Sequence, residues 1–124
     1  MDSILKTIKK FLGISDEETH FDTDLIIHIN SVFSILNQLG VGPSKSFQIQ
    51  DEKETWDQFI EDDTDFNDVK TYMYLKVKLL FDPPASSSVM SAMERQISEL
   101  EWRLNVSAFI LSKSLEEEDN DEII

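Results

Sequence analysis

Residues 65–84, DFNDVKTYMYLKVKLLFDPP, hold the densest run of large apolar side chains in the sequence. Only four polar residues interrupt the run from Val69 to Phe81, so a helix here would be apolar over most of its circumference. Such a helix packs against neighbours on several sides, and we expect Leu75 and Leu80 to lie in the core. The two prolines that follow end the helix, because proline cannot donate a backbone hydrogen bond.

Helical periodicity extends to three other parts of the chain. Apolar residues recur at helical spacing in each of them, and together with the central stretch they predict helices near residues 3–12, 23–39, 66–82 and 87–108. Gly13 and Gly40 suit the left-handed position that ends a helix. In the first helix, Lys6, Lys9 and Lys10 fall on the polar face. The sequence therefore predicts an all-α fold, a small bundle of about four helices.

A long irregular loop separates the second predicted helix from the third. Within it, Phe47 and Ile49 alternate with polar residues, as in a short strand, and residues 55–60 could form one helical turn. A loop this long in a small domain is uncommon and is often functional. We expect one helical domain over residues 1–111 and a flexible acidic tail over residues 112–124.

The chain carries a net charge of −14, and most of it lies in two places. Residues 44–68 hold nine acids against two lysines, and residues 116–124 hold six acids and no base. Such a surface repels phosphates and offers no basic footprint for binding nucleic acid. A channel or docking role is one interpretation of the acidic loop, carried by Asp51, Glu52, Glu54, Asp57, Glu61, Asp62 and Asp63.

The sequence contains no convincing catalytic, cofactor or metal motif. His20, Asp22, Asp24 and His28 are better explained as helix caps and surface residues than as metal ligands. Asp63, Asp65 and Asn67 are spaced like the start of a calcium loop, but Asp68 stands where its glycine belongs and Tyr74 where its final Glu belongs. The chain has no cysteine and no apolar run of membrane-spanning length. We therefore predict neither enzyme activity nor a cofactor; a hydrolase that uses the acidic loop is the least favoured alternative.

The last predicted helix has two apolar stripes. One stripe has the 3, 4, 3, 4 spacing of a coiled-coil seam and consists of Met90, Met93, Ile97, Leu100 and Leu104. Trp102 lies about 200° around the helix from Leu100, and Val106 and Phe109 extend its side. We interpret Trp102, Val106 and Phe109 as a contact surface for another subunit or partner. The alternative is that residues 46–60 fold back and cover this stripe, with Trp56 or Phe59 in contact.

The order of these elements, together with three segments, resembles the head–tail connector, or adaptor, proteins of long-tailed double-stranded DNA phages. The segments are FDTDLIIHINSVFSILNQLGVG at residues 21–42, VKTYMYLKVKLLFDPP at residues 69–84 and SAMERQISELEWRLNV at residues 91–106. Many adaptors follow the apolar helix with a Tyr-x-Asn-Arg run. Here residues 79–82 read LLFD and two prolines follow, so the contacts of that run cannot be transferred to this chain.

The resemblance implies a structural virion protein in the neck, assembled in the host cytoplasm. It implies a homo-oligomeric ring of about twelve subunits between the portal protein and a downstream stopper or tail-completion protein. Such a ring extends the DNA channel, through which DNA passes without specific binding. The alternative, from another functional class of protein, is an acidic DNA mimic or inhibitor that occupies a basic groove on its partner. That alternative explains the charge equally well but explains the two-striped helix less well.

We predict that the acidic tail is mobile in the free subunit. Five of the six residues from Glu116 to Asp121 are acidic, so they repel one another and have no apolar surface to bury. Sharp random-coil NMR signals are expected from these residues in the monomer. Strong amide protection there would contradict the prediction.

Overall fold

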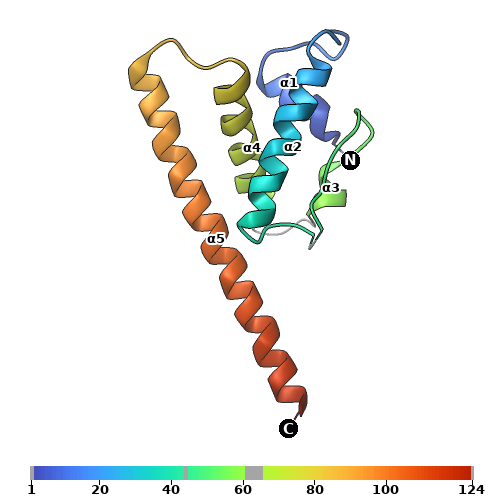
Figure 1. Cartoon of the computed structure of the whole chain (residues 1–124), viewed down its shortest axis with the longest axis vertical. Helices are drawn as coiled ribbons and strands as arrows, with labels where there is room; N and C mark the ends of the chain where they lie inside the picture. The colour runs from blue at the N-terminus through green and yellow to red at the C-terminus, as the bar shows by residue number, and fades with distance from the viewer. Residues whose placement is uncertain (1, 44, 61–65, 124) are drawn as a thin grey trace.

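The computed structural model describes residues 2–43, 45–60 and 66–123, the last nine of these by backbone alone. Its helices, in chain order, are α1 (Ile4–Phe11), α2 (Asp22–Gln38), α3 (Trp56–Phe59), α4 (Phe66–Phe81) and α5 (Ser87–Ile123). The described residues contain no strand, and one isolated antiparallel bridge pairs Ser3 with Thr55. Four of the helices form a compact body, and α5 runs along one side of it and projects beyond it (Figure 1). The predicted all-α bundle is confirmed.

Helix α4 is the central element, as its apolar circumference predicts. It packs against α1, α2 and α5. Val69, Tyr72, Met73 and Val77 are fully buried along its length. Burial on several sides explains why this helix shows no clean polar face in the sequence.

Leu80 does not share the burial of the central helix, and its predicted place in the core is wrong. Leu75 is 5% exposed, whereas Leu80 is 52% exposed. Leu80 lies in the last turn of α4, where the chain turns away towards the start of α5 (Figure 1). Phe81 in the same turn packs edge-on against Phe21, with ring centroids 5.3 Å apart, but Leu80 lies on the uncovered side of the helix.

Helix α1 is held to the following turn by a buried lysine, Lys9, whose burial the sequence pattern did not predict. Lys9 was expected on the exposed face, yet it is 2% exposed. Its ammonium donates to the backbone oxygens of Asp16 (3.3 Å) and Glu18 (2.6 Å) and lies 2.9 Å from the Asp22 carboxylate. A buried charge is tolerated when it is paired and hydrogen-bonded in this way. Lys9 thereby fastens the α1–α2 turn and the start of α2 to α1.

Residues 45–55 form no strand, so the predicted short strand at Phe47–Ile49 is wrong. The amide side chain of Asn30 takes the place of a pairing strand. Its Oδ1 accepts from the backbone N–H of Ile49 at 2.8 Å, and its Nδ2 donates to the Ile49 carbonyl at 3.0 Å. Both backbone groups of Ile49 are thus satisfied, and the side chain is 2% exposed.

The predicted helical turn at residues 55–60 is confirmed as α3. Trp56 is buried against α1, where its indole N–H donates to the Thr7 hydroxyl at 3.1 Å. Phe59 packs with Phe33 and Phe47, and their ring centroids are 4.7–5.5 Å apart. The loop between α2 and α4 is therefore anchored to the body by its aromatic side chains.

Gly42 is required where the chain leaves α2. Its φ is +89°, in the left-handed region that favours glycine. A Cβ at this position would lie 2.3 Å from the Phe59 ring. Gly13 and Gly40 also have positive φ, as expected of the residues that end α1 and α2.

Helix α5 is longer than predicted. The periodic pattern indicates an end near residue 108, but the backbone remains helical to Ile123. After Pro84 the sequence contains neither proline nor glycine, and the residues beyond Phe109 include strong helix formers such as leucine, lysine and glutamate. Whether the acidic end is mobile in the free subunit remains a prediction.

We predict that Leu75→Ala and Leu80→Ala, two changes on the same helix, have different costs. Leu75→Ala should lower the free energy of unfolding by about 2–5 kcal/mol, because it opens a cavity in a packed core. Leu80→Ala should lower it by less than about 1 kcal/mol, because half of the side chain is already in water. Urea unfolding followed by circular dichroism measures both. Equal losses would show that Leu80 is buried to the same extent as Leu75.

We predict that Tyr72→Phe leaves stability at pH 7 unchanged or raises it by about 1 kcal/mol. The Tyr72 hydroxyl is buried and has no hydrogen-bond partner among the described residues. Burial, and secondly the nearby Glu101 carboxylate, raise the pKa of Tyr72 above its usual value. The unfolded phenol ionises near pH 10, so the wild type should lose stability above that pH relative to the variant.

Urea unfolding at pH 7 and at about pH 10.5 tests this, and Tyr74→Phe provides the control. A Tyr72→Phe variant less stable than wild type at both pH values would show that the hydroxyl is satisfied.

Candidate functional site

The body-facing stripe of α5 packs as predicted. Ile97, Leu100 and Leu104 are buried against the body, and Met93 is partly buried beside them. The Arg103 guanidinium adds polar contacts, 3.7 Å from the Asp68 carboxylate of α4 and 3.2 Å from Glu99 on its own helix. These contacts hold the first half of α5 against the body, and so they fix which of its faces points outwards.

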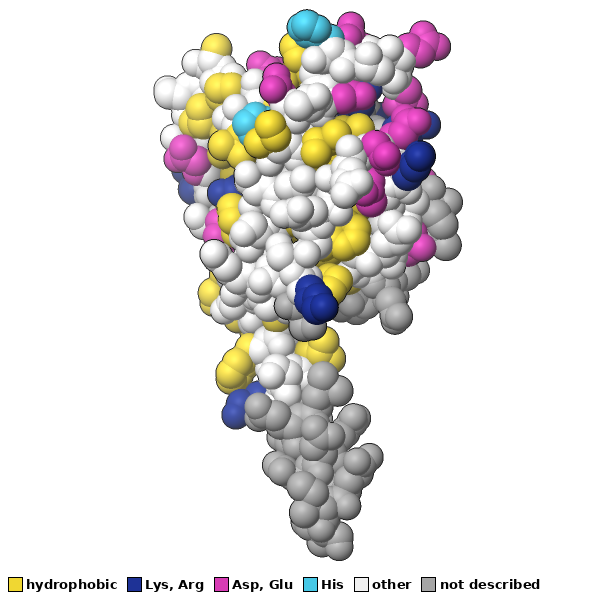
Figure 2. All heavy atoms as spheres, turned by 45° about the vertical axis from the view of Figure 1, so that its right-hand side comes forward, with side chains coloured by type: hydrophobic (Ala, Val, Ile, Leu, Met, Phe, Trp, Pro, Cys, Tyr) yellow, Lys and Arg dark blue, Asp and Glu magenta, His cyan; other side chains and the backbone are white. Residues whose placement is uncertain are grey.

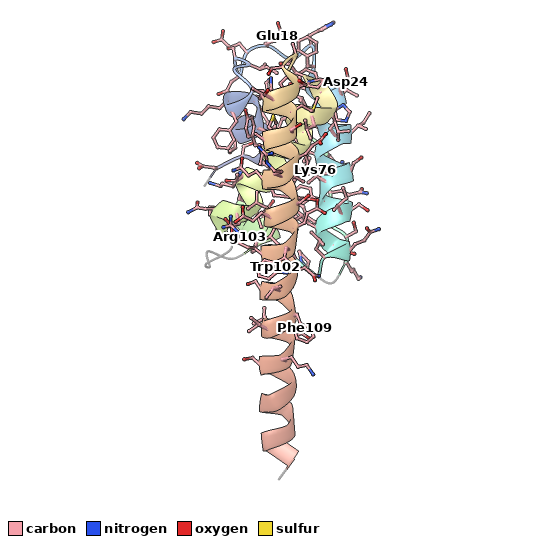
Figure 3. All side chains as sticks on the ribbon, turned by 90° about the vertical axis from the view of Figure 1, so that its left-hand side faces the viewer. Glu18, Asp24, Lys76, Trp102, Arg103 and Phe109 are labelled. Atoms are coloured by element: carbon pink, nitrogen blue, oxygen red, sulfur yellow. The ribbon has the colours of Figure 1, made fainter. Side chains whose placement is uncertain are left out.

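The opposite stripe of α5 is exposed. Trp102 is 67% exposed, Phe109 is 60% exposed and Val106 is half-buried. Figure 3 shows α5 in front of the body, with Trp102 where the helix still passes the body and Phe109 farther along, on the part that projects beyond it. Burial of a Trp on folding is the usual expectation, so a Trp two-thirds in water on a firmly held helix marks a candidate contact surface.

The alternative arrangement, in which residues 46–60 cover this stripe, is wrong. Trp56 is 1% exposed and Phe59 is 4% exposed, but both are buried in the core of the body. Trp56 donates a hydrogen bond to Thr7 of α1, and Phe59 packs on Phe33 of α2. The aromatic residues of the loop therefore complete the core and leave Trp102 uncovered.

A groove of about 630 Å³ lies where α5 passes the end of α2. Val106 and Phe109 line it from α5, facing Leu39 and Gly40 at the end of α2. The Asn105 amide donates to the Leu39 carbonyl at 3.3 Å, and a Cβ on Gly40 would lie 3.2 Å from Ala108. Two of the three predicted contact residues thus line a formed groove as well as an exposed face.

Two further exposed residues were missed in the sequence. Ile110 and Leu111 are each 61% exposed, next to Phe109. Successive residues on a helix point about 100° apart, so these three apolar side chains span about 200° of the circumference. Figure 2 shows apolar side chains on both sides of α5 where it leaves the body. The spacing of the sequence could have identified Leu111, because it follows Leu104 by seven residues and continues the seam past the end of the body.

Four of the acidic loop residues lie in the described part of the loop, and these four make separate local contacts and do not converge on one site. The Glu54 carboxylate accepts from the backbone N–H of Gln50 (2.8 Å) and of Asp51 (3.3 Å), and Asp51 accepts from the N–H of Lys53 at 2.7 Å. Glu52 lies 3.8 Å from Lys6. Asp57 is exposed in the first turn of α3.

The remaining loop acids, Glu61, Asp62 and Asp63, lie outside the described residues. Where the structure describes the loop, its carboxylates stabilise a local turn. Acidic side chains nevertheless gather along one edge of the body, with lysines among them (Figure 2).

The described residues contain no group of three or more His, Cys, Asp or Glu side chains placed to hold a metal ion. Among the described helices, none combines the length and the apolar character that crossing a membrane requires. The arrangement on α5, an exposed apolar stripe on a helix held by its other face, is suited to packing against another macromolecule.

Comparison with known proteins identifies the family of the chain. The chain matches the family described as phage connector protein over residues 4–109, which includes α1 to α4 and the body-contacting part of α5. No curated protein and no solved structure matches the chain. The matched segment is most of the chain and ends at Phe109, within the exposed stripe. The chain therefore belongs to the phage connector proteins, a family of structural proteins.

Proposed function

We propose that the protein is an adaptor subunit of the neck of a tailed double-stranded DNA phage. In this proposal, copies assemble as a ring of about twelve subunits beneath the portal protein and present a docking surface to a stopper or tail-completion protein. The ring lengthens the channel through which DNA passes. The subunit is made in the host cytoplasm and ends in the virion neck. It requires no cofactor and performs no catalysis.

The exposed stripe of Trp102, Val106 and Phe109 carries the proposal beyond family membership. Exposed apolar residues scattered singly need no explanation, but a Trp and a Phe two turns apart on the same face form a continuous patch. Trp is enriched among the residues that dominate binding energy at interfaces. Because α5 is held against α4, the patch loses little conformational freedom on binding. It is suited to packing on a neighbouring subunit or on the portal.

The charge of the chain supports a channel role. The chain has a net charge of −14, most of it from loop and tail acids, and this charge disfavours tight contact with DNA phosphates. DNA can then slide past the ring without being held. The rival function, an acidic DNA mimic that occupies a basic groove, shares this charge. It is less well supported, because a DNA mimic has no use for an uncovered Trp on a projecting helix.

We predict that Trp102→Ala separates assembly from folding. The melting temperature of the monomer should stay nearly unchanged, because the side chain is largely in water. Binding to neighbouring subunits or to a portal ring should weaken by about 2 kcal/mol or more, roughly thirtyfold in affinity. Thermal melts and sedimentation with and without portal rings measure the two effects.

Ile27→Ala provides the matched control, since Ile27 is 58% exposed on α2, outside the stripe. Its assembly should match that of the wild type. A large loss of monomer stability in Trp102→Ala, or the same loss of assembly in both variants, would refute the role of the stripe.

A further inference from the structure

We propose that the groove beside α1 binds the C-terminal part of α5 from a second copy of the chain. The inference rests on the proposed function only in that copies of this chain associate. The inference identifies the surface that receives the projecting helix. The exposed stripe alone does not identify that surface.

The groove has a volume of about 950 Å³ and lies between α1, the α1–α2 turn and residues 52–55. Lys6, Lys10, Lys53 and Lys70 line it, four of the eleven basic residues of the chain. Three acids, Asp2, Asp16 and Glu52, line it too. These lining side chains sum to a formal charge of +1, whereas the whole chain carries −14. The groove is therefore much less acidic than the rest of the molecule.

Its lysines are weakly paired. Lys6 lies 3.8 Å from Glu52 and Lys70 lies 3.9 Å from Asp2, both with exposed carboxylates. Among the described residues, Lys10 and Lys53 have no ion-pair partner. Two lysines outside the groove have closer partners: Lys78 lies 2.7 Å from Asp82, and Lys9 lies 2.9 Å from Asp22. The groove thus offers ammonium groups that an incoming anionic segment could pair with.

The end of α5 has the complementary chemistry. Phe109, Ile110 and Leu111 are exposed, and six of the seven residues from Glu116 to Glu122 are acidic. The groove provides an apolar wall, Phe11 and Ile14, with Phe11 46% exposed. An amphipathic helix that lays its apolar face into a groove is a common mode of recognition. Two turns of a helix about 10 Å wide occupy about 850 Å³, so the groove of about 950 Å³ holds about half of the four turns from Phe109 to Glu122.

With α5 as one continuous helix, the segment that fills the groove comes from another copy, and the acidic tail that we predict to be mobile in the free subunit becomes ordered in that contact. Helix α5 leaves the body near Ala108 and continues as one helix to Ile123, so its end lies far from α1 (Figure 1). The groove is lined mainly by α1 and the α1–α2 turn, and the contacts between helices pair α5 with α4, with none of comparable extent between α5 and α1. A contact between two different surfaces of identical subunits is heterologous and produces a ring when the rotation closes. Each subunit would give its α5 end to one neighbour and receive that of the other.

Cysteine cross-linking tests this contact directly, because the chain has no cysteine of its own. Ser15→Cys places a thiol at the edge of the groove, and Ser114→Cys places one on the exposed end of α5. Equimolar mixing of the two variants under mild oxidation should give a disulfide heterodimer. Ser31→Cys, exposed on α2 outside the groove, is the control partner for Ser114→Cys and should give at least tenfold less.

Charge variants in the groove give the second readout. Lys10→Glu with Lys53→Glu, made in the Ser15→Cys chain, should reduce the heterodimer at least tenfold. Lys10→Arg with Lys53→Arg should preserve it, and raising the salt concentration should weaken it, because exposed charge pairs are screened. Circular dichroism checks that each variant folds.

The mixtures are run at high protein concentration alone and again with portal rings. Equal yields with Ser31→Cys, no heterodimer in either condition, or a yield unaffected by charge reversal would overturn the proposal. If the Ser15–Ser114 contact forms but the chain never joins the portal, the neck function fails and the groove stands. If the chain joins the portal but the Ser15–Ser114 contact does not form, the groove contact fails and the neck function stands.

Discussion

Burial of α4 on several sides is the constraint on which the rest of the structure depends. Tyr72 and Met73 are fully buried because α1, α2 and α5 all pack against this helix. With the interior filled in this way, each surrounding helix has to bury only one of its faces. Helix α5 carries a second apolar face, and α4 cannot cover both. The exposure of Trp102 therefore follows from where α4 lies.

Polar side chains, rather than regular elements, hold the remaining segments to the body. Asn30 hydrogen-bonds both backbone groups of Ile49, and Lys9 binds two carbonyls and a carboxylate around the α1–α2 turn. Each replaces contacts that a strand or a longer helix would have supplied. A chain of 124 residues can in this way complete a core around one central helix and leave a long helix to project.

The two surfaces considered for function differ in how they are built. The stripe of Trp102, Val106 and Phe109 belongs to a helix held by its opposite face, so its geometry is set before any partner arrives. The groove beside α1 is polar and lined by weakly paired lysines. The first is suited to affinity through apolar burial, and the second to orientation through charge. In the proposed ring, both properties are useful, because subunits would have to be held together and also placed in register.

Helical periodicity and turn chemistry in the sequence were enough to determine the all-α class, the starts of the helices, the turn at Trp56–Phe59 and the two faces of α5. These features depend on residues near one another in the chain, so local spacing reports them. Tertiary structure alone decided that Leu80 is exposed, that Lys9 is buried and that Ile49 pairs with a side chain instead of a strand. Periodicity identifies which face of a helix is apolar, but not where the neighbouring element ends. It also cannot show which distant carbonyls will surround an ammonium, because those positions are fixed only when the helices pack.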